Sequence, residues 1–574
     1  MKTGLANNFK ATGCGLALFL VFATGSLLEA DVKLPAIFGD HMVLQQEAAL
    51  PVWGTADPGE KVTVTVGAES ASTTAEANGK WSVKLKALPS GSAPVTMIVE
   101  GKNKLTFSDV LVGDVWICSG QSNMEFNFSG AHNATDELPK ADDPQLRLFS
   151  VLHTVSIQPA TDVDRKQGGG EWKLCTPQTI PSFTAVGYFF GRELRSKLKR
   201  PVGLIESCWG GTSAETWTSL SALESTPALA DYVTHYNTQL AAFPKAMEMY
   251  PAQMTDYQAA LEKWNKEGKI PYQAAMSAWN AAVEAAKAAG ATPPPRPTAG
   301  GPPPMPHNPN GDSHVPTVLF NGMIAPLIHY AIKGTIWYQG ESNTARAMEY
   351  RTLFPLMITD WRQRWGLGDF PFLFVELAAY DDSAYPNQNW ALLRESQVKT
   401  LALPRTGMAS AVDIGDPKNV HPQDKLDVGL RLALAARHVA YGEDVVCSGP
   451  LYDSMKVEGG AIRITFTQTG GGLILGQAPW IPASLQKNPV STTELESFTI
   501  AGADKNWVPA QSKIDGNTVV VSSAQVTQPV AVRYGWSDAP RCNLYNKEKL
   551  PASPFRTDDW PEISPPPAAP PTGK

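Results

Sequence analysis

The sequence predicts an α/β protein in which a buried parallel sheet is flanked, before and after in the chain, by β modules. Two observations lead to this fold class. Apolar runs alternate with helical stretches between residues 110 and 440, as in strands buried on both faces. Shorter segments with apolar–polar alternation and turn residues lie on either side. The 574 residues accommodate several domains, and a hydrophobic content of 43% excludes a wholly disordered chain.

The N-terminal module is expected over residues 31–109. Val62–Val66 alternates after the turn Asp57–Gly59, and Trp81–Leu85 alternates after Asn78–Gly79. Val95–Val99 repeats the period of two. This spacing is typical of a small β-sandwich-like domain.

The α/β region is expected over residues 110–440 and contains five apolar, strand-like runs. Parallel sheets bind ligands beyond the carboxyl ends of their strands, so the residues after each run are the candidates for function. The runs are Asp114–Cys118, Val202–Ile205, Gly334–Tyr338, Phe372–Val375 and Met408–Val412.

An insertion is expected within this region, at about residues 220–315. Residues 252–290 are Ala-rich and predict two helices, broken near Gly268 and Pro271. The proline-rich tract Thr292–Pro309 excludes both a helix and a central strand, and predicts an extended excursion.

The period-two pattern returns over residues 441–560 and predicts a second β-sandwich-like module. Its clearest strands are Ile462–Phe466, Thr518–Val521 and Ala531–Tyr534. The proline-rich tail, residues 561–574, is expected to be disordered.

Residues 1–30 predict a signal peptide. Lys2 and Lys10 precede the apolar stretch Gly15–Ala23, and Leu28–Ala30 offers a cleavage site. No later stretch approaches eighteen uninterrupted apolar residues, so no membrane span is expected. We therefore expect an exported protein, periplasmic or secreted.

The composition argues against several other classes of function. A net charge of −7 is unlike that of a nucleic-acid-binding protein with a general basic surface. Removal of Cys14 with the signal peptide would leave five widely spaced cysteines, whose disulfide pairing stays open. Neither CxxC pairs nor metal-ligand histidine spacing is present, so we expect no metal site and no cofactor.

The first strand end, Cys118–Met124, carries the candidate nucleophile Ser122. A serine in a tight glycine-containing turn after a buried strand can expose its hydroxyl above the sheet. The alternative role for such a serine is to cap the following helix.

The second and third strand ends offer candidates for stabilising an oxyanion. Gly210 and Gly211 follow the second strand and can aim backbone N–H groups at a developing negative charge, or form an ordinary turn. Gln339 and Asn343 follow the third strand, and either side-chain amide could complete such a site.

The last strand end, Asp413–Pro422, carries the candidate base His421. Pro422 suits the first position of a helix. The apolar stripe of that helix is expected to consist of Leu426, Leu430, Ala433 and Leu434. A histidine there, with carboxylates upstream, fits a general base, although a lone surface histidine is the common alternative. Nucleophile, oxyanion donors and base thus occur at four strand ends, as an acyl-transfer site requires.

These motifs resemble the sialate O-acetylesterase family of SGNH-type hydrolases, and the likeness covers nearly the whole mature chain. The motifs are Gly120–Met124, Gly210–Ser213, Trp337–Asn343 and Asp413–Pro422, together with Leu34–Leu44, Ala531–Trp536 and Leu550–Phe555. The resemblance implies an SGNH-hydrolase-like fold and an esterase that removes O-acetyl groups from sugars, most often 9-O-acetylated sialic acid.

The resemblance also implies residue roles. Ser122 would be the nucleophile and His421 the base, with oxyanion donors from the Ser122 N–H, a Gly210 or Gly211 N–H, and the Gln339 or Asn343 amide. SGNH hydrolases place the acid three residues before the histidine, where this chain has Lys418. Asp416 is then the first choice to orient His421, Asp413 the second, and a Ser–His pair alone is a third arrangement.

Two alternatives stay open at this stage. One keeps the chemistry and changes the substrate to acetylated xylan or another polysaccharide. The other is a non-catalytic carbohydrate-binding protein that uses its 16 tryptophans for sugar stacking. The oligomeric state is left open.

Overall fold

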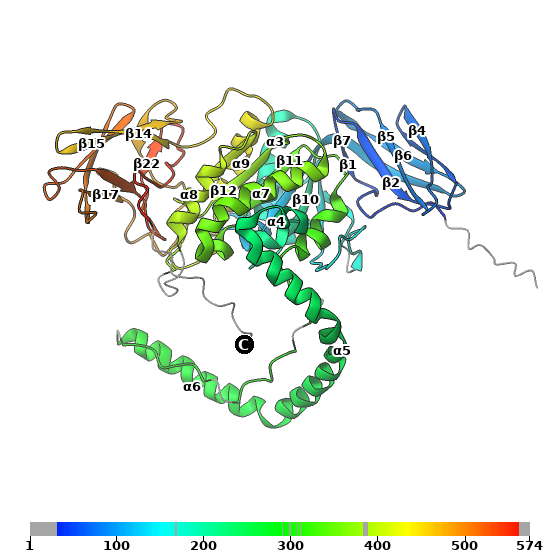
Figure 1. Ribbon diagram of the computed structural model, residues 1–574, viewed down its shortest axis with the longest axis horizontal. Helices are drawn as coiled ribbons and strands as arrows, with labels where there is room; N and C mark the ends of the chain where they lie inside the picture. Colours follow the sequence, from blue (N-terminus) through cyan, green and yellow to red (C-terminus); the bar gives the residue numbers. More distant parts are fainter. Residues whose placement is uncertain are drawn as a thin grey trace, which may run out of the picture.

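The computed structural model describes residues 31–166, 169–289, 291–297, 300–306, 308–309, 311–382 and 389–561. The predicted signal peptide and all but the first residue of the predicted tail lie outside these residues. Figure 1 shows an α/β region in the middle, with β structure from the two ends of the chain on opposite sides of it.

The N-terminal part consists of antiparallel strands and of the short β1, which pairs parallel with the later strand β7, Lys104–Gly120. β2 pairs with β5, while β3 pairs with β4 and β6, and the three predicted strands correspond to β3, β5 and β6. The bounds are β1 Val43–Gln45, β2 Leu50–Thr55, β3 Lys61–Val66, β4 Glu69–Thr74, β5 Lys80–Leu85 and β6 Gly91–Glu100.

The strand β7, Lys104–Gly120, links this part to the central sheet. Its first half pairs antiparallel with β6, and its second half pairs parallel with β10 and β11. The expected boundary between residues 109 and 110 therefore falls inside one continuous strand.

The central sheet has the order β13-β12-β11-β7-β10-β8-β9, parallel except for β9. All residues of β10, β11 and β12 are buried, which requires cover on both faces of the sheet. The predicted α/β class and its five strand-like runs are thus confirmed. The bounds are β8 Asp143–Ser150, β9 Trp172–Cys175, β10 Val202–Cys208, β11 Gly334–Tyr338, β12 Phe372–Glu376 and β13 Thr406–Ser410.

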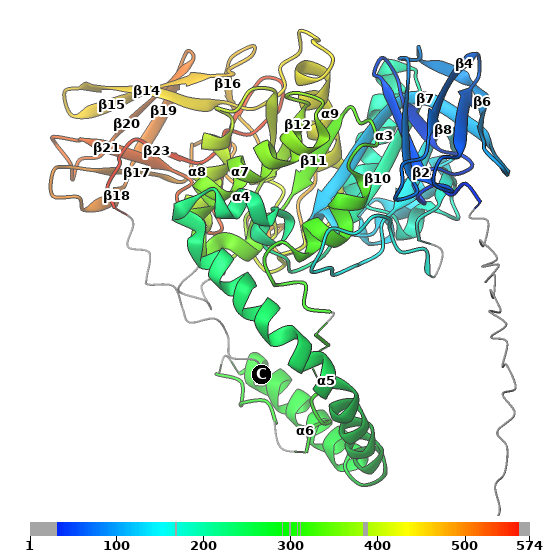
Figure 2. The ribbon, with the colours of Figure 1, turned by 45° about the vertical axis from the view of Figure 1, so that its right-hand side comes forward.

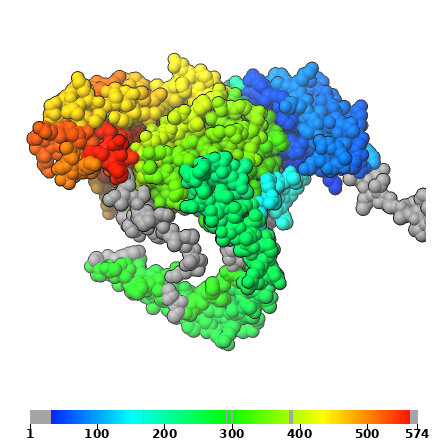
Figure 3. All heavy atoms as spheres, in the orientation of Figure 1, coloured from blue at the N-terminus to red at the C-terminus, as the bar shows by residue number. Residues whose placement is uncertain are grey.

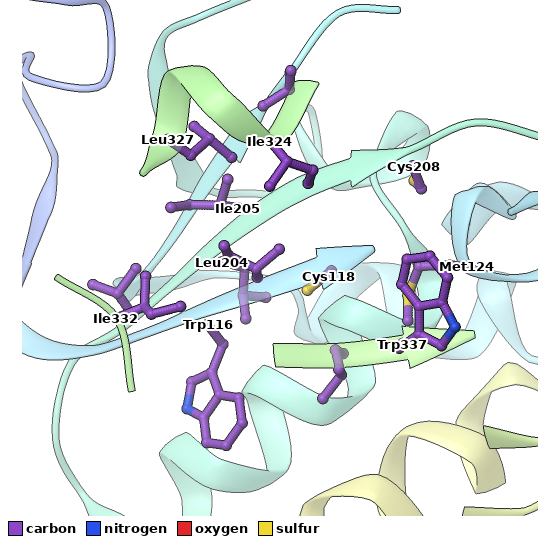
Figure 4. Packing of buried hydrophobic residues seen from close by; sticks show 14 of the residues in the cluster. Trp116, Cys118, Met124, Leu204, Ile205, Cys208, Ile324, Leu327, Ile332 and Trp337 are labelled. Carbon is purple, nitrogen blue, oxygen red and sulfur yellow. The ribbon is translucent and has the colours of Figure 1, made fainter. Parts of the chain in front are cut away.

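Helices pack on this sheet around one large apolar core. Figure 4 shows Trp116, Cys118, Leu204 and Trp337 from the central strands within that core. The main helices are α3 Ala185–Leu198, α7 Ala347–Trp365, α8 Trp390–Thr400 and α9 Lys425–Val439, with the short α1 Ser122–Glu125, α2 Ala134–Glu137 and α4 Leu220–Glu224. Short 3-10 or π turns cover Phe128–Gly130, Leu138–Lys140, Ile180–Ser182, Ala214–Trp217, Pro227–Leu229, Phe320–Ile324, Ala325–Leu327 and Glu341–Arg346.

The predicted insertion forms a helical arm that stands away from the body (Figures 1, 2 and 3). α5 spans Ala230–Glu267 and α6 spans Lys269–Ala288, with the break at Gly268 as predicted. α5 begins well before the expected residue 252, and includes Pro244 and Pro251. The described residues of the proline-rich tract are neither helix nor strand.

The C-terminal part contains two four-stranded antiparallel sheets, β14-β15-β20-β19 and β18-β17-β21-β23, which share one apolar cluster. The three predicted strands are β15, β20 and β21. The bounds are β14 Leu451–Glu458, β15 Ala461–Thr467, β16 Leu473–Leu475, β17 Phe498–Ala501, β18 Trp507–Pro509, β19 Gln511–Asp515, β20 Thr518–Ser522, β21 Ala531–Tyr534, β22 Leu544–Asn546 and β23 Phe555–Arg556.

Two features of the described residues bear on the environment of the protein. None of their helices is long and apolar enough to cross a membrane. Their five cysteines carry free thiols, and four of these are buried.

Candidate active site

The turn after β7 places Ser122 at the carboxyl edge of the sheet. Gly120 has φ +134°, and a Cβ there would lie 2.2 Å from the Tyr338 carbonyl oxygen, so only glycine fits. The Gln121 N–H then donates to that same carbonyl at 2.9 Å. The chain turns sharply, and Ser122 becomes the first residue of α1, half-buried.

His421 follows β13, the last strand of the central sheet along the chain, and its side chain lies next to that of Ser122. Its Nε2 lies 2.8 Å from Ser122 Oγ, although 299 residues separate the two. The prediction that Pro422 begins a helix is wrong, because α9 starts at Lys425 and is capped by Asp424, which accepts the Asp427 N–H at 3.1 Å. His421 therefore belongs to the loop before α9.

Asp413, the second choice to orient His421, has other partners. Its carboxylate accepts two hydrogen bonds from Arg431, at 2.6 and 2.7 Å, and one from the Tyr545 hydroxyl at 2.8 Å. This fully buried pair is a structural link between α9 and the C-terminal part of the chain.

Asp416, the first choice, is also engaged elsewhere. Its Oδ1 accepts the Lys418 N–H at 2.9 Å and the Ser484 hydroxyl at 2.7 Å. Among the residues that the structure describes, no carboxylate is hydrogen-bonded to His421. The arrangement in this structure is thus a Ser–His pair, and the role given to Asp416 remains a prediction without a contact.

The glycines after β10 differ in what their N–H groups do. The Gly210 N–H donates to Glu125 Oε2 at 2.6 Å, and a Cβ on Gly210 would lie 3.2 Å from Ser122 Cβ. Gly211, at φ +76°, has no partner for its N–H within the described ranges. The Ser122 N–H, at the start of α1, is likewise free of an intrahelical partner. Gly211 and Ser122 are therefore the backbone donors open to a ligand.

The two candidate amides after β11 are buried and support the loop that follows β10. Gln339 Nε2 donates to Asn343 Oδ1 at 2.6 Å and to the Thr212 carbonyl at 3.3 Å, which uses both of its hydrogens. Asn343 Nδ2 donates to Glu215 at 3.0 Å, which leaves one hydrogen. Of the two amides, Asn343 is the one with a donor to spare.

Beneath Ser122 lies a buried polar cluster that the sequence did not single out: Asn123, Glu341 and Lys425. Asn123 Nδ2 donates to Glu341 Oε1 at 2.6 Å, and Lys425 Nζ donates to Asn123 Oδ1 at 2.5 Å. Burial lowers the pKa of Lys425 to about 7 and raises the pKa of Glu341. Asn123 and Glu341 lie inside recognised motifs, whereas nothing in the sequence distinguishes Lys425.

A second missed group lies on the other side of Ser122. The carboxylate of Glu125, which accepts the Gly210 N–H, also pairs with His153 Nε2 at 2.7 Å. The His153 ring stacks on Trp209, with centroids 4.1 Å apart and planes within 6°. An aromatic pair beside a carboxylate is the kind of surface that contacts a sugar ring and its hydroxyls.

The electrostatics favour a neutral His421. Burial, and then the positive charge of Lys425, lower the pKa of its imidazole below the ordinary value of 6.5. A neutral imidazole can accept the Ser122 proton. No group of three or more His, Cys, Asp or Glu side chains in the described segments is arranged to hold a metal ion.

Comparisons with known proteins show which family the chain resembles. Residues 317–438 match the profile of the carbohydrate esterase family described as sialic acid-specific acetylesterase. The chain is 30% identical to the sialate O-acetylesterase of Rattus norvegicus and 29% identical to that of Mus musculus; each alignment covers 94% of this chain and 97% of the relative. A solved carbohydrate acetylesterase from Xanthomonas citri superposes with a TM-score of 0.72 and 36% identity, over 92% of this chain and 100% of that one.

These matches place the chain among the carbohydrate esterases. Within that class, it belongs to the sialate O-acetylesterase family.

Proposed function

We propose that the protein hydrolyses O-acetyl esters on sugars through an acetyl-enzyme formed on Ser122. The observation that carries this proposal is the 2.8 Å contact between Ser122 Oγ and His421 Nε2 at the carboxyl edge of the parallel sheet.

In the first half of the reaction, Ser122 Oγ attacks the acetyl carbonyl carbon while His421 Nε2 takes the hydroxyl proton. The resulting oxyanion is stabilised by the Ser122 and Gly211 N–H groups, with the remaining Asn343 N–H as third donor. His421 then returns the proton to the departing sugar oxygen.

In the second half, His421 takes a proton from water, and the hydroxide attacks the acetyl-enzyme. The second tetrahedral oxyanion uses the same donors. As it collapses, the bond from the carbonyl carbon to Ser122 Oγ breaks and His421 returns its proton to Oγ, which releases the acetyl group as the acid and regenerates the Ser122 hydroxyl.

We propose 9-O-acetylated sialic acid as the substrate, because the mammalian relatives are named sialate O-acetylesterases. The Xanthomonas relative is named only as a carbohydrate acetylesterase, which keeps acetylated xylan as the second candidate. Acetate release from 9-O-acetyl sialic acid, acetylxylan and a chromogenic acetate ester would be measured side by side. We expect the highest kcat/KM on the sialic acid ester. Sugar binding without acetate release from any of them would overturn the enzymatic proposal.

The pH dependence of the reaction follows from His421. Activity requires the neutral imidazole, so kcat/KM should rise with pH through a midpoint below 6.5. Lys425, whose pKa is about 7, is charged over this range. In Lys425→Met that charge is absent, the imidazolium is less disfavoured, and the midpoint should move to higher pH.

The measurement is kcat/KM on the chromogenic ester from about pH 4 to about pH 9. Lys418→Met is the matched control. Lys418 is an exposed lysine in the loop that carries His421, and it does not shift the pKa of that histidine. Identical acid limbs in wild type and Lys425→Met would contradict the assignment of His421 as base.

Export is part of the proposal. The N-terminal segment that predicts a signal peptide lies outside the described residues, so the sequence of residues 1–30 alone supports a periplasmic or secreted enzyme.

A further inference from the structure

Asn123 forms a second connection between the segments that carry Ser122 and His421, in addition to the contact between those two side chains. Asn123 follows Ser122 directly, and Val420 directly precedes His421. Asn123 Nδ2 donates to the Val420 carbonyl at 2.9 Å. This bond therefore joins the turn after β7 to the loop before α9 one residue away from each reacting side chain.

The orientation of the Asn123 amide is fixed. A carbonyl oxygen only accepts hydrogen bonds, so the nitrogen of the amide must face Val420. Its second hydrogen goes to Glu341 Oε1 at 2.6 Å, and its oxygen accepts from Lys425 Nζ at 2.5 Å. Both hydrogens and the oxygen of the amide are therefore used.

The charged partners are held rigidly as well. Lys425 is fully buried, and its ammonium lies 4.7 Å from the centre of the Phe126 ring and 5.4 Å from that of Tyr338. Asn123 is 1% exposed. Displacement of the Asn123 amide would break its hydrogen bonds with both Lys425 Nζ and Glu341 Oε1, so the network favours the observed geometry.

We propose that Asn123 is a positioning residue that sets the distance between Ser122 and His421, with Glu341 and Lys425 fixing its amide. The inference rests on the proposed function. Within the described residues, the loop that carries His421 is otherwise hydrogen-bonded to the segment that follows the Ser122 turn through His132, whose N–H donates to the Gln423 carbonyl at 3.1 Å. Its bonds to Asp381 and Ser484 connect it to other parts of the chain and do not reach Ser122. Without the bridge to Val420, we expect the imidazole to drift from Ser122 Oγ.

Asn123→Asp tests this without changing the size of the side chain. One carboxylate oxygen can still accept from Lys425, but the other would face the Val420 carbonyl and the Glu341 carboxylate, so both donated bonds become repulsions. We expect kcat on the chromogenic ester to fall about 10²-fold, with KM changed less than about threefold. The rate of phosphonylation of Ser122 by a small fluorophosphonate should fall by a similar factor, because that reaction needs the Ser–His pair but no sugar.

The matched control is Asn543→Asp in the C-terminal part. Asn543 is also fully buried, and its Nδ2 donates to two carbonyls, those of Ser491 at 2.9 Å and Glu494 at 2.7 Å. It should lower thermal stability comparably while kcat per titrated active site stays within about twofold of wild type.

A wild-type kcat per titrated site in Asn123→Asp would overturn the inference, whereas absence of esterase activity in the wild type would overturn the proposed function instead. Should Asn123→Asp not accumulate as folded protein, Asn123→Ser removes the bridge without adding charge. The same loss of kcat is then expected, and unchanged kcat and phosphonylation rates in that variant would overturn the inference.

Discussion

Ser122→Ala is expected to lower kcat on a chromogenic acetate ester by about 10⁴–10⁶-fold. Without Oγ no acetyl-enzyme can form, and the backbone donors at Ser122 and Gly211 can only assist direct attack by water. The substitution removes one oxygen from a half-buried side chain and adds no bulk, so the fold and the sugar affinity should persist. Steady-state kinetics would measure the loss of kcat. Mass spectrometry after fluorophosphonate treatment would show whether a covalent adduct still forms.

Ser119→Ala is the matched control for this variant. Ser119 belongs to the same strand end and is fully buried, and its Oγ has no hydrogen-bond partner within the described ranges. Its removal should leave kcat unchanged, and the phosphonate adduct should still map to Ser122. Wild-type turnover in Ser122→Ala would refute the nucleophile, whatever the control shows.

The strands and the two reacting residues were predictable because their sequence patterns are local. A continuous apolar run such as Gly334–Tyr338 can bury all of its side chains only in a sheet that is covered on both faces. The positions of Ser122 and His421 after such runs then follow from the common edge at which parallel strands end.

The orientation of α9 was not predictable in the same way. Of the expected stripe, Ala433 is buried as predicted, whereas Leu426, Leu430 and Leu434 are only half-buried. Val428 and Leu432, which were not expected on that face, are in the core. α9 packs against α3 as well as the sheet, and a close approach to α3 selects the face with small residues. A Cβ on Gly429, for example, would lie 2.6 Å from Phe189 Cβ.

The partners of charged residues were also beyond the sequence. Lys425 reads as an ordinary helix-surface lysine, because its acceptor Asn123 lies 302 positions away. Asp416 seemed close enough to His421 to orient it, but the direction of a loop side chain depends on contacts such as that with Ser484, 68 positions away. Proximity in sequence within a loop does not determine which groups face each other.

The α5 arm illustrates a further limit of local patterns. Pro244 and Pro251 argue against a helix before residue 252, since proline in a helix interior removes a hydrogen bond and costs about 3 kcal/mol. The flanking residues are good helix formers, and the exposed arm leaves room for local bending at each proline. The helix therefore continues through both positions.

His421→Ala is expected to lower kcat nearly as far as Ser122→Ala, by about 10⁴–10⁶-fold, because the two residues act as one unit. Within the described residues, His421 Nε2 is the group hydrogen-bonded to Ser122 Oγ, so its removal takes away the acceptor for the Ser122 proton. The cavity left by the half-buried ring should admit free imidazole, so added imidazole should restore part of kcat in His421→Ala but none in Ser122→Ala.

His438→Ala serves as the control, because His438 lies at the exposed end of α9 and bonds only the Glu443 carbonyl. It should keep wild-type kcat and show no response to imidazole. Retention of kcat in His421→Ala within about tenfold of wild type would mean that another group accepts the proton. The candidate for that group is His153, which contacts Glu125 and Trp209 beside the Ser122 turn. The double variant His421→Ala, His153→Ala would then test whether His153 accepts the proton. Loss of the residual activity in the double variant would transfer the role of base to His153.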